Sequence, residues 1–210
     1  MAGRIASSHS ALAVAVTGRK GIVMSDDAVY DARREVRTFA DLYQGADVLL
    51  ELAKSGMAGS YHTTMAALLM TAFTFEAYLN HIGAEKIAYW PEMESISITK
   101  KHSALCKLFG VSHDKSQRPG QTIKKLFDFR NSIAHGKSFV LQETRDVPLS
   151  FIPPFQHPPA PWEEYCTVDN AERAMEDVGS VIADLHKAAG YGDAPFLSGR
   201  STFSLISKKR

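Results

Sequence analysis

Residues 67–80 read A-L-L-M-T-A-F-T-F-E-A-Y-L-N. Apolar side chains recur within this stretch and on either side of it at alternating intervals of three and four residues, as on one face of an α-helix. The stripe consists of Tyr61, Met65, Leu68, Ala72, Phe75, Leu79 and Ile82. It predicts a helix that begins near Ser60 and ends at Gly83.

A second apolar stripe precedes this helix. Ser25 is a candidate N-cap, and Asp26 and Asp27 would lie in the first turn, where carboxylates interact favourably with the helix dipole. The stripe consists of Val29, Ala32, Val36, Phe39, Tyr43, Ala46, Leu50 and Ala53. Gly56 follows it, and two long helices joined by a short turn should pack antiparallel. The sequence therefore predicts an all-α fold, an antiparallel helical bundle.

Shorter helices are expected after this pair. Residues 85–90 form a short helical pattern that Pro91 would stop, and residues 103–109 form another. Residues 121–135 give a clear helix with Gly136 at its C-terminal end. A last long helix carries Ala171, Ala174, Val178, Val181 and Leu185, and its start is marked by a capping-box pair, Asp169 with Glu172.

Residues 138–166 interrupt the helical pattern. Residues 139–141 and 149–152 could form short strands, and the run P-P-F-Q-H-P-P-A-P-W at 153–162 predicts an extended surface loop. We expect a Pro-rich insertion here, before the last helix of a domain that spans residues 25–189. Residues 1–24 are expected to be a disordered extension, with a transit peptide as the alternative, and residues 190–210 a loose basic tail.

Composition sets further limits. Cys106 and Cys166 are the only cysteines among the 210 residues, which excludes a disulfide framework and a thiolate cluster and fits a reducing compartment such as the cytoplasm. The hydrophobic fraction of 45% is ordinary for a globular protein. No apolar run approaches the roughly 18 residues that span a bilayer, so no membrane association is expected.

Charge is distributed unevenly along the chain. Residues 25–198 carry a net charge of −6, which excludes a protein that binds nucleic acid through an overall basic surface. Residues 100–137 alone carry +7 and could form a local patch that binds phosphate. The candidate RNA-binding residues are Lys100, Lys101, Lys124, Lys125 and Lys137; a solvated basic face is the alternative.

Residues 127–137 read F-D-F-R-N-S-I-A-H-G-K. Arg130 occupies a position of the apolar stripe in the helix at 121–135, where a guanidinium needs a carboxylate, a phosphate or water, because an unpaired buried charge is costly. Asn131 and His135 are four residues apart and share one helical face. The sequence thus predicts a polar cluster beside an apolar seam.

Each residue of the cluster also has a structural explanation. Arg130 could be part of an ion pair, for which Glu76 is the best candidate partner, with Asn80 one turn further along the same helix. His135 could cap the C-terminal end of its helix, and Asn131 could be a surface residue. Glu76 itself could be an exposed side chain on a helix flank.

R-N-S-I-A-H at residues 130–135 resembles the R-x4-H motif of the HEPN superfamily, including the polar residue that often follows the Arg. The helix at 67–80 also resembles HEPN sequences, in which a Glu and an Asn often follow an apolar run. The resemblance covers residues 25–188, and the Pro-rich insertion at 138–166 departs from the family pattern. It implies a HEPN-like bundle.

The resemblance implies an endoribonuclease that needs no metal or other cofactor and acts at a cleft between two subunits. His135 would transfer protons, Arg130 would bind phosphoryl oxygens, and Asn131 would orient either group, with Glu76 and Asn80 in support. RNA and a second copy of the chain are the expected partners. A bacterial defence or toxin role, with an antitoxin as a further partner, is what the resemblance suggests. The alternative is a non-catalytic HEPN-like module that binds RNA, a nucleotide or a protein.

Other chemistries find little support in the sequence. The eight histidines show neither H-x3-H nor H-E-x2-H spacing, so no metal site is expected. The glycines at 56–60 lack the Lys of a phosphate-binding loop, and no G-x-S-x-G elbow is present. Cys106 is interpreted as a small core residue.

Overall fold

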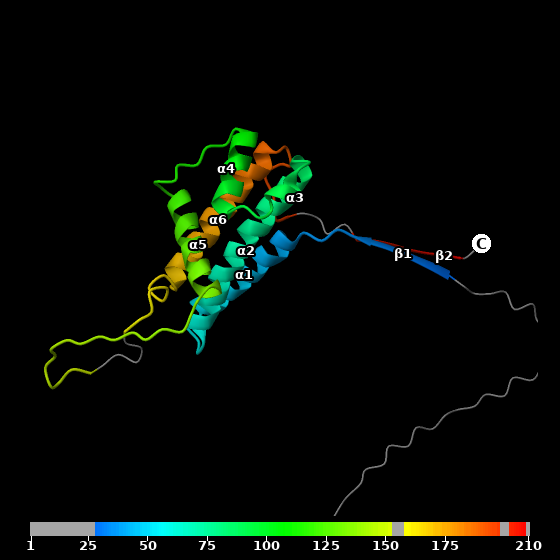
Figure 1. The fold of residues 1–210 in the computed structure, drawn as a ribbon. Coiled ribbons are helices and arrows are strands. Elements are labelled where there is room, and N and C mark those ends of the chain that lie inside the picture. Colours follow the sequence, from blue (N-terminus) through cyan, green and yellow to red (C-terminus); the bar gives the residue numbers. More distant parts are fainter. Residues whose placement is uncertain (1–27, 153–157, 198–201, 209–210) are drawn as a thin grey trace, which may run out of the picture. The chain divides into compact units, whose positions relative to one another are not determined.

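The computed structural model describes residues 28–152, 158–197 and 202–208. The chain divides into two units, a helical unit within residues 35–201 and a two-stranded unit formed by segments near the two ends. Six helices and two strands lie in the described ranges (Figure 1). None of the described helices is both long enough and apolar enough to cross a membrane. The sequence prediction for residues 1–24 lies outside the described ranges.

Helix α2 (Ser60–Lys86) is the centre of the helical unit. Helices α1, α3, α4, α5 and α6 all pack against it (Figure 1). Eleven of its 27 residues are buried, and they include large apolar side chains on more than one side. Buried Thr64, Thr71 and Thr74 each donate a hydroxyl hydrogen bond to the carbonyl four residues earlier, so these polar groups cost little to bury.

Two long helices flank α2. Helix α1 (Thr38–Lys54) is joined to α2 by the turn at 55–59, and the two helices pack side by side (Figure 1). The expected antiparallel pair is therefore present. Helix α6 (Val168–Ala188) packs against both of them through a stripe that includes Ala171, Ala174, Val178, Val181 and Leu185, as the sequence predicts.

Three shorter helices complete the unit. They are α3 (Trp90–Met93), α4 (Ile98–Phe109) and α5 (Gly120–Ala134). Both α4 and α5 contact α2 and α6, and the ion pair between Arg130 and Glu76 places the α5 motif beside the middle of α2. Arg118, just before α5, donates to both carboxylate oxygens of the buried Asp177 on α6 and also pairs with Glu176, at distances of 2.7–3.2 Å.

Strands β1 (Ala28–Arg34) and β2 (Thr202–Lys208) form the second unit. They pair antiparallel with Val29 opposite Ser207 and Arg33 opposite Phe203. The prediction that the first helix begins at Ser25 is wrong for residues 28–34, which form a strand. The prediction of a loose tail is wrong for residues 202–208, which also form a strand. Val29 and Ala32 fit a helical stripe, but backbone pairing with a segment about 170 residues away prevails, and no local pattern reports such pairing.

Several other boundaries differ from the sequence predictions. Pro91 does not end a helix at residues 85–90: α2 continues to Lys86, and Pro91 lies in the first turn of α3, where its missing N–H costs no hydrogen bond. Helix α4 begins at Ile98, five residues earlier than expected. Asp169 does not cap α6, because the hydroxyl of Thr167 accepts from the backbone N–H of Asn170.

The insertion between α5 and α6 contains no strand among its described residues. Residues 139–141 and 149–152 are irregular or form turns, and their large apolar side chains are exposed. An isolated strand cannot satisfy its backbone hydrogen bonds without a partner, so apolar alternation alone is not sufficient. Of the Pro-rich run predicted to be an extended loop, residues 153–157 lie outside the described ranges. Residues 158–166 contain a bend, turns and irregular chain and no helix or strand.

Substitution of Gly83 would test the close packing of α2 against α3. A methyl group at Gly83 would overlap the indole ring of the buried Trp90. Gly83→Ala should therefore lower the free energy of unfolding by about 1–3 kcal/mol in urea denaturation, despite the better helix propensity of Ala. In the matched variant Gly45→Ala, the methyl would meet the flexible Met70 side chain, which can move, so little loss is expected. Equal losses in the two variants would contradict this account.

Candidate functional site

A pocket of about 560 Å³ lies where α2, α4 and α5 meet the segments before and after α4. Its apolar wall includes Phe75, Ile123 and Phe127. Polar and charged side chains from three directions line the rest, among them Glu76, His102, His113, Lys124, Arg130 and Asn131. The structure thus brings together Glu76, Arg130 and Asn131, which the sequence singles out, and adds two histidines.

Arg130 and Glu76 form the predicted ion pair. The Arg130 Nη2 atom lies 3.1 Å from Glu76 Oε2, and both side chains are about a quarter exposed, 24% and 28%. The guanidinium also lies over the ring of Phe73, 5.6 Å from its centroid. The carboxylate compensates the charge of an Arg at a seam position and fixes the direction of its N–H groups.

Asn131 extends this arrangement. Its side-chain oxygen accepts a hydrogen bond of 3.0 Å from Arg130 Nη1. The carboxylate and the amide together occupy two of the five N–H donors of the guanidinium. The Nε–H group of Arg130 is buried without a partner among the described residues. The Nη1 and Nη2 atoms of Arg130 each have a second N–H group, which could donate a hydrogen bond to an anionic oxygen bound at the pocket.

His135 is placed differently from the other motif residues. It is the C-cap residue of α5, it is exposed, and it does not line the pocket. Asn131 lies four residues earlier, and its carbonyl accepts a hydrogen bond from the His135 backbone N–H. Arg130 and Asn131 therefore line the pocket, whereas His135 lies on the exposed surface at the end of the same helix.

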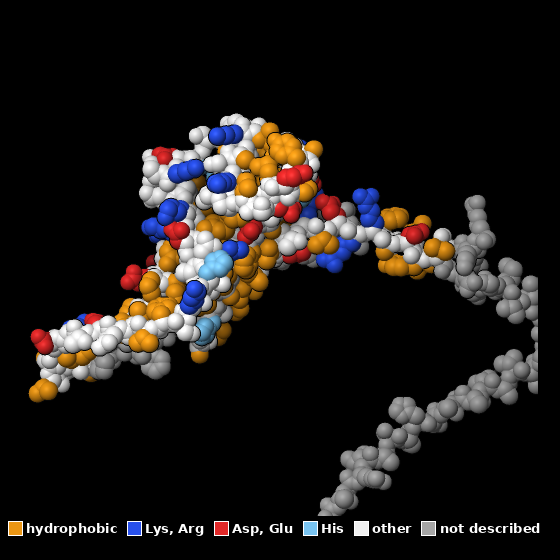
Figure 2. Space-filling view, viewed as in Figure 1, with side chains coloured by type: hydrophobic (Ala, Val, Ile, Leu, Met, Phe, Trp, Pro, Cys, Tyr) orange, Lys and Arg blue, Asp and Glu red, His pale blue; other side chains and the backbone are white. Residues whose placement is uncertain are grey.

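The predicted basic patch is only partly on the surface. Lys101 is wrong as a surface cation: it is 2% exposed, and its ammonium donates a 2.9 Å hydrogen bond to Asn80. Asn80 therefore accepts a hydrogen bond from buried Lys101 and does not line the pocket with Glu76 and Arg130, where the HEPN resemblance implies a supporting role for it. Four of the predicted lysines are exposed: Lys100, Lys124, Lys125 and Lys137. Figure 2 shows basic and acidic side chains intermixed over the α4 and α5 face, and Lys124 pairs with Asp128 at 2.8 Å.

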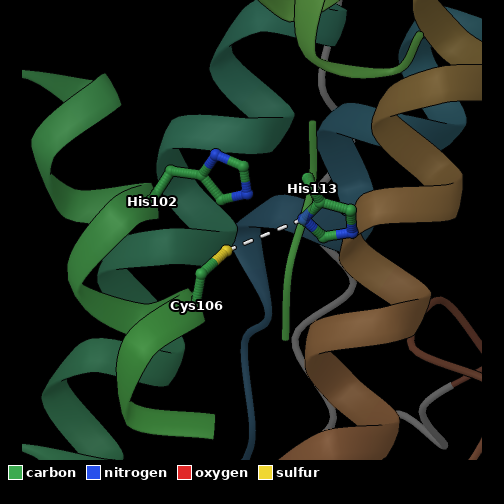
Figure 3. Close-up of side chains that lie close together, drawn as sticks. All are labelled: His102, Cys106 and His113. Carbon is green, nitrogen blue, oxygen red and sulfur yellow. Dashed lines mark hydrogen bonds between the residues drawn. The ribbon is translucent and has the colours of Figure 1, made fainter. Parts of the chain in front are cut away.

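Sequence reasoning missed a second group of side chains at the pocket. His102 and His113 line it, Cys106 lies close to both of them, and we call the three the His–Cys cluster (Figure 3). Burial, with the nearby charges of His113 and Lys115, lowers the pKa of His102 to about 4. Burial raises the pKa of the Cys106 thiol. The detectable signal was H-x3-C followed by a His seven residues later, which a search for paired histidines does not find.

Comparisons with known proteins do not assign the chain to a family. No family model matches the chain, and no curated protein or solved structure matches it. The resemblance to the HEPN superfamily therefore rests on the R-x4-H motif, the helix that carries Glu76 and the helical order of the chain.

The Arg130–Glu76 pair should contribute to stability. Arg130→Ala leaves the half-buried Glu76 carboxylate unpaired, so the free energy of unfolding should fall by about 1–3 kcal/mol, between the values typical of surface and buried pairs. A double-mutant cycle with Glu76→Ala should give a coupling free energy of about 1 kcal/mol.

Lys124→Ala is the control for this measurement. The Lys124–Asp128 pair spans one helical turn on α5 with both side chains largely exposed, 73% and 64%, so its loss should cost less than about 0.5 kcal/mol. Urea denaturation of the variants would check both values. A coupling free energy near zero for Arg130 and Glu76 would show that the pair does not stabilise the fold.

Proposed function

We propose that the chain is an endoribonuclease that cleaves RNA without a metal ion, at a groove formed by two copies of the chain. Arg130, Asn131 and His135 would carry the reaction. The observation that supports this most directly is the guanidinium of Arg130, which Glu76 and Asn131 hold at the wall of a pocket of about 560 Å³.

The roles follow from the chemistry of RNA cleavage. The 2′-hydroxyl attacks the adjacent phosphorus and loses its proton, the bond from phosphorus to the 5′-oxygen breaks, and that oxygen gains a proton. Arg130 suits the phosphoryl oxygens because its planar fork donates hydrogen bonds in pairs. His135 is an exposed imidazole, and imidazole is the side chain most often used as a general acid or base. The products would be a 2′,3′-cyclic phosphate and a 5′-hydroxyl.

A dimer would supply what one chain lacks. The reaction needs a base and an acid, whereas the motif provides one His per chain. A two-fold axis would place two copies of His135 and Arg130 in one groove. Phe73, whose ring lies under the Arg130 guanidinium, is 40% exposed, so apolar surface borders the motif. The HEPN resemblance suggests the same dimer and a bacterial defence or toxin role, with an antitoxin as a further partner.

One observation favours a second candidate function. His135 does not line the pocket that Arg130 and Asn131 share. A chain in which the pocket alone is used would bind RNA or a nucleotide through the guanidinium and the exposed lysines without cleaving it. Binding that His135→Ala leaves unchanged, with no cleavage by the unmodified protein, would favour this binder over the enzyme.

His135→Ala tests the proposed enzyme. The variant should lose about a hundredfold or more of the RNA-cleavage rate, because general acid–base groups typically contribute about 10²–10⁴. Its stability should change little, since the side chain is exposed. Cleavage of labelled RNA would be followed by gel, with chemical analysis of the product ends.

His62→Ala is the matched control, since His62 is also an exposed histidine but belongs to the first turn of α2. It should cleave at the unmodified rate. Cleavage should also persist in excess chelator and leave 2′,3′-cyclic phosphate ends. Full activity of His135→Ala would refute the catalytic role of the motif, and 5′-phosphate products would refute attack by the 2′-hydroxyl.

The dimer makes a separate prediction. Sedimentation should show a dimer, and cleavage per chain should fall on dilution below its dissociation constant. A stable interface would bury at least about 1,000 Å². Phe73→Ser should raise the dissociation constant at least tenfold, whereas Leu108→Ser, which changes an exposed Leu on α4, should not. A monomer with unchanged activity per chain at every dilution would refute the shared groove.

A further inference from the structure

The His–Cys cluster has the composition and the convergence of a transition-metal site. His102 and Cys106 are four residues apart on α4 and therefore share one helical face. His113 follows Gly110, whose left-handed conformation (φ 69°) ends α4 and turns the chain back toward the helix. Figure 3 shows both imidazole rings beside the Cys106 sulfur.

The distances approach those of a tetrahedral zinc site. Cys106 Sγ lies 3.6 Å from His113 Nδ1, and one ligand atom from each of the three residues lies within 4.8 Å of the other two. Zn–S bonds of about 2.3 Å and Zn–N bonds of about 2.0–2.1 Å at tetrahedral angles separate ligand atoms by about 3.3–3.6 Å. Small side-chain rotations would therefore bring all three atoms to one ion.

Hydrogen bonds around the cluster match those of a metal-binding histidine. His113 Nε2 lies 3.1 Å from Asp184 Oδ2 on α6, so the Nε2–H can donate to the carboxylate and leave the Nδ1 lone pair directed toward Cys106. A carboxylate on the far nitrogen is the usual support of a metal-bound imidazole. The His113 side chain is only 8% exposed, which restricts its orientation.

A hydrogen bond from the Cys106 thiol to His113 explains part of this arrangement but not all of it. His102 Nε2 is buried and has no hydrogen-bond partner among the described residues. A buried polar atom without a partner is costly, and a metal ion would satisfy it. The His102 and His113 rings stack 5.4 Å apart, so both are held beside the same sulfur.

We infer that His102, Cys106 and His113 bind one Zn²⁺ ion, with Asp184 as the positioning residue for His113. Binding would form the Zn–S bond as the Cys106 thiol releases its proton to solvent, and no oxidant or reductant takes part. His102 and His113 also line the pocket near Arg130, so the fourth coordination position would face that pocket and take water or an anionic oxygen.

Cobalt substitution tests this site. The metal-free full-length protein should take up one Co²⁺ per chain and show a sulfur-to-cobalt charge-transfer band in the near ultraviolet together with tetrahedral d–d bands. Cys106→Ser should abolish the charge-transfer band, and His113→Ala should lower Zn²⁺ affinity at least a hundredfold. Asp184→Asn should lower it about 10–100-fold, as is typical when such a supporting carboxylate is changed.

Cys166→Ser is the matched control, because Cys166 is the other cysteine and contacts the backbone of Tyr61 instead of a histidine. It should keep the band and the affinity. Circular dichroism of each variant would establish that it is folded. Absence of the band in the unmodified protein, an equal band in Cys106→Ser, or uptake unaffected by both Cys106→Ser and His113→Ala would overturn the site.

The same variants separate this site from the proposed RNA cleavage. Cleavage by Cys106→Ser at the unmodified rate, with the band lost, would support a zinc site that is distinct from the reaction. Loss of cleavage in Cys106→Ser with full activity in His135→Ala would refute the proposed metal-free mechanism and support the zinc site. Loss of cleavage in His135→Ala, together with no cobalt uptake by the unmodified protein, would support the proposed metal-free mechanism and refute the zinc site.

Discussion

The burial of α2 is the constraint on which the helical unit depends. A helix with one apolar face needs one neighbour, whereas α2 buries side chains toward α1, α4, α5 and α6. Burying an apolar side chain stabilises the fold by roughly 1.5–3 kcal/mol, so the neighbours are held chiefly by their shared contact with α2. Several polar groups at this centre have partners that offset the cost of their burial, such as the threonine hydroxyls bound to their own helix and Lys101 bound to Asn80.

The pocket is a consequence of that arrangement. Helices α4 and α5 both pack on α2, and their connection carries His113 and Lys115 back to the space between them. Glu76 projects from α2 into this space and compensates the charge of Arg130 from α5. One carboxylate on the central helix thus compensates a charged residue at a seam position and at the same time holds its guanidinium beside the pocket.

The sequence predicts the parts of this fold that depend on local pattern. The start of α2, the extent of α5 to within one residue and the stripe of α6 follow from apolar spacing, whereas the end of α2 lies beyond the predicted Gly83. The Arg130–Glu76 pair follows from the cost of an unpaired guanidinium. Features set by distant segments could not be predicted in this way. The β1–β2 pairing, the burial of Lys101 and the approach of His113 to Cys106 all depend on where the chain returns, which periodicity does not report.

The β1–β2 pair also changes how the chain can be regarded topologically. Because Ala28 lies opposite Lys208, the first residue of β1 and the last residue of β2 lie at the same end of a two-stranded ribbon. The helical unit is in effect an insertion between two adjacent strands. Joining Lys208 to Ala28 and opening the chain within the exposed residues 142–150 would permute the sequence circularly while leaving every described helix intact.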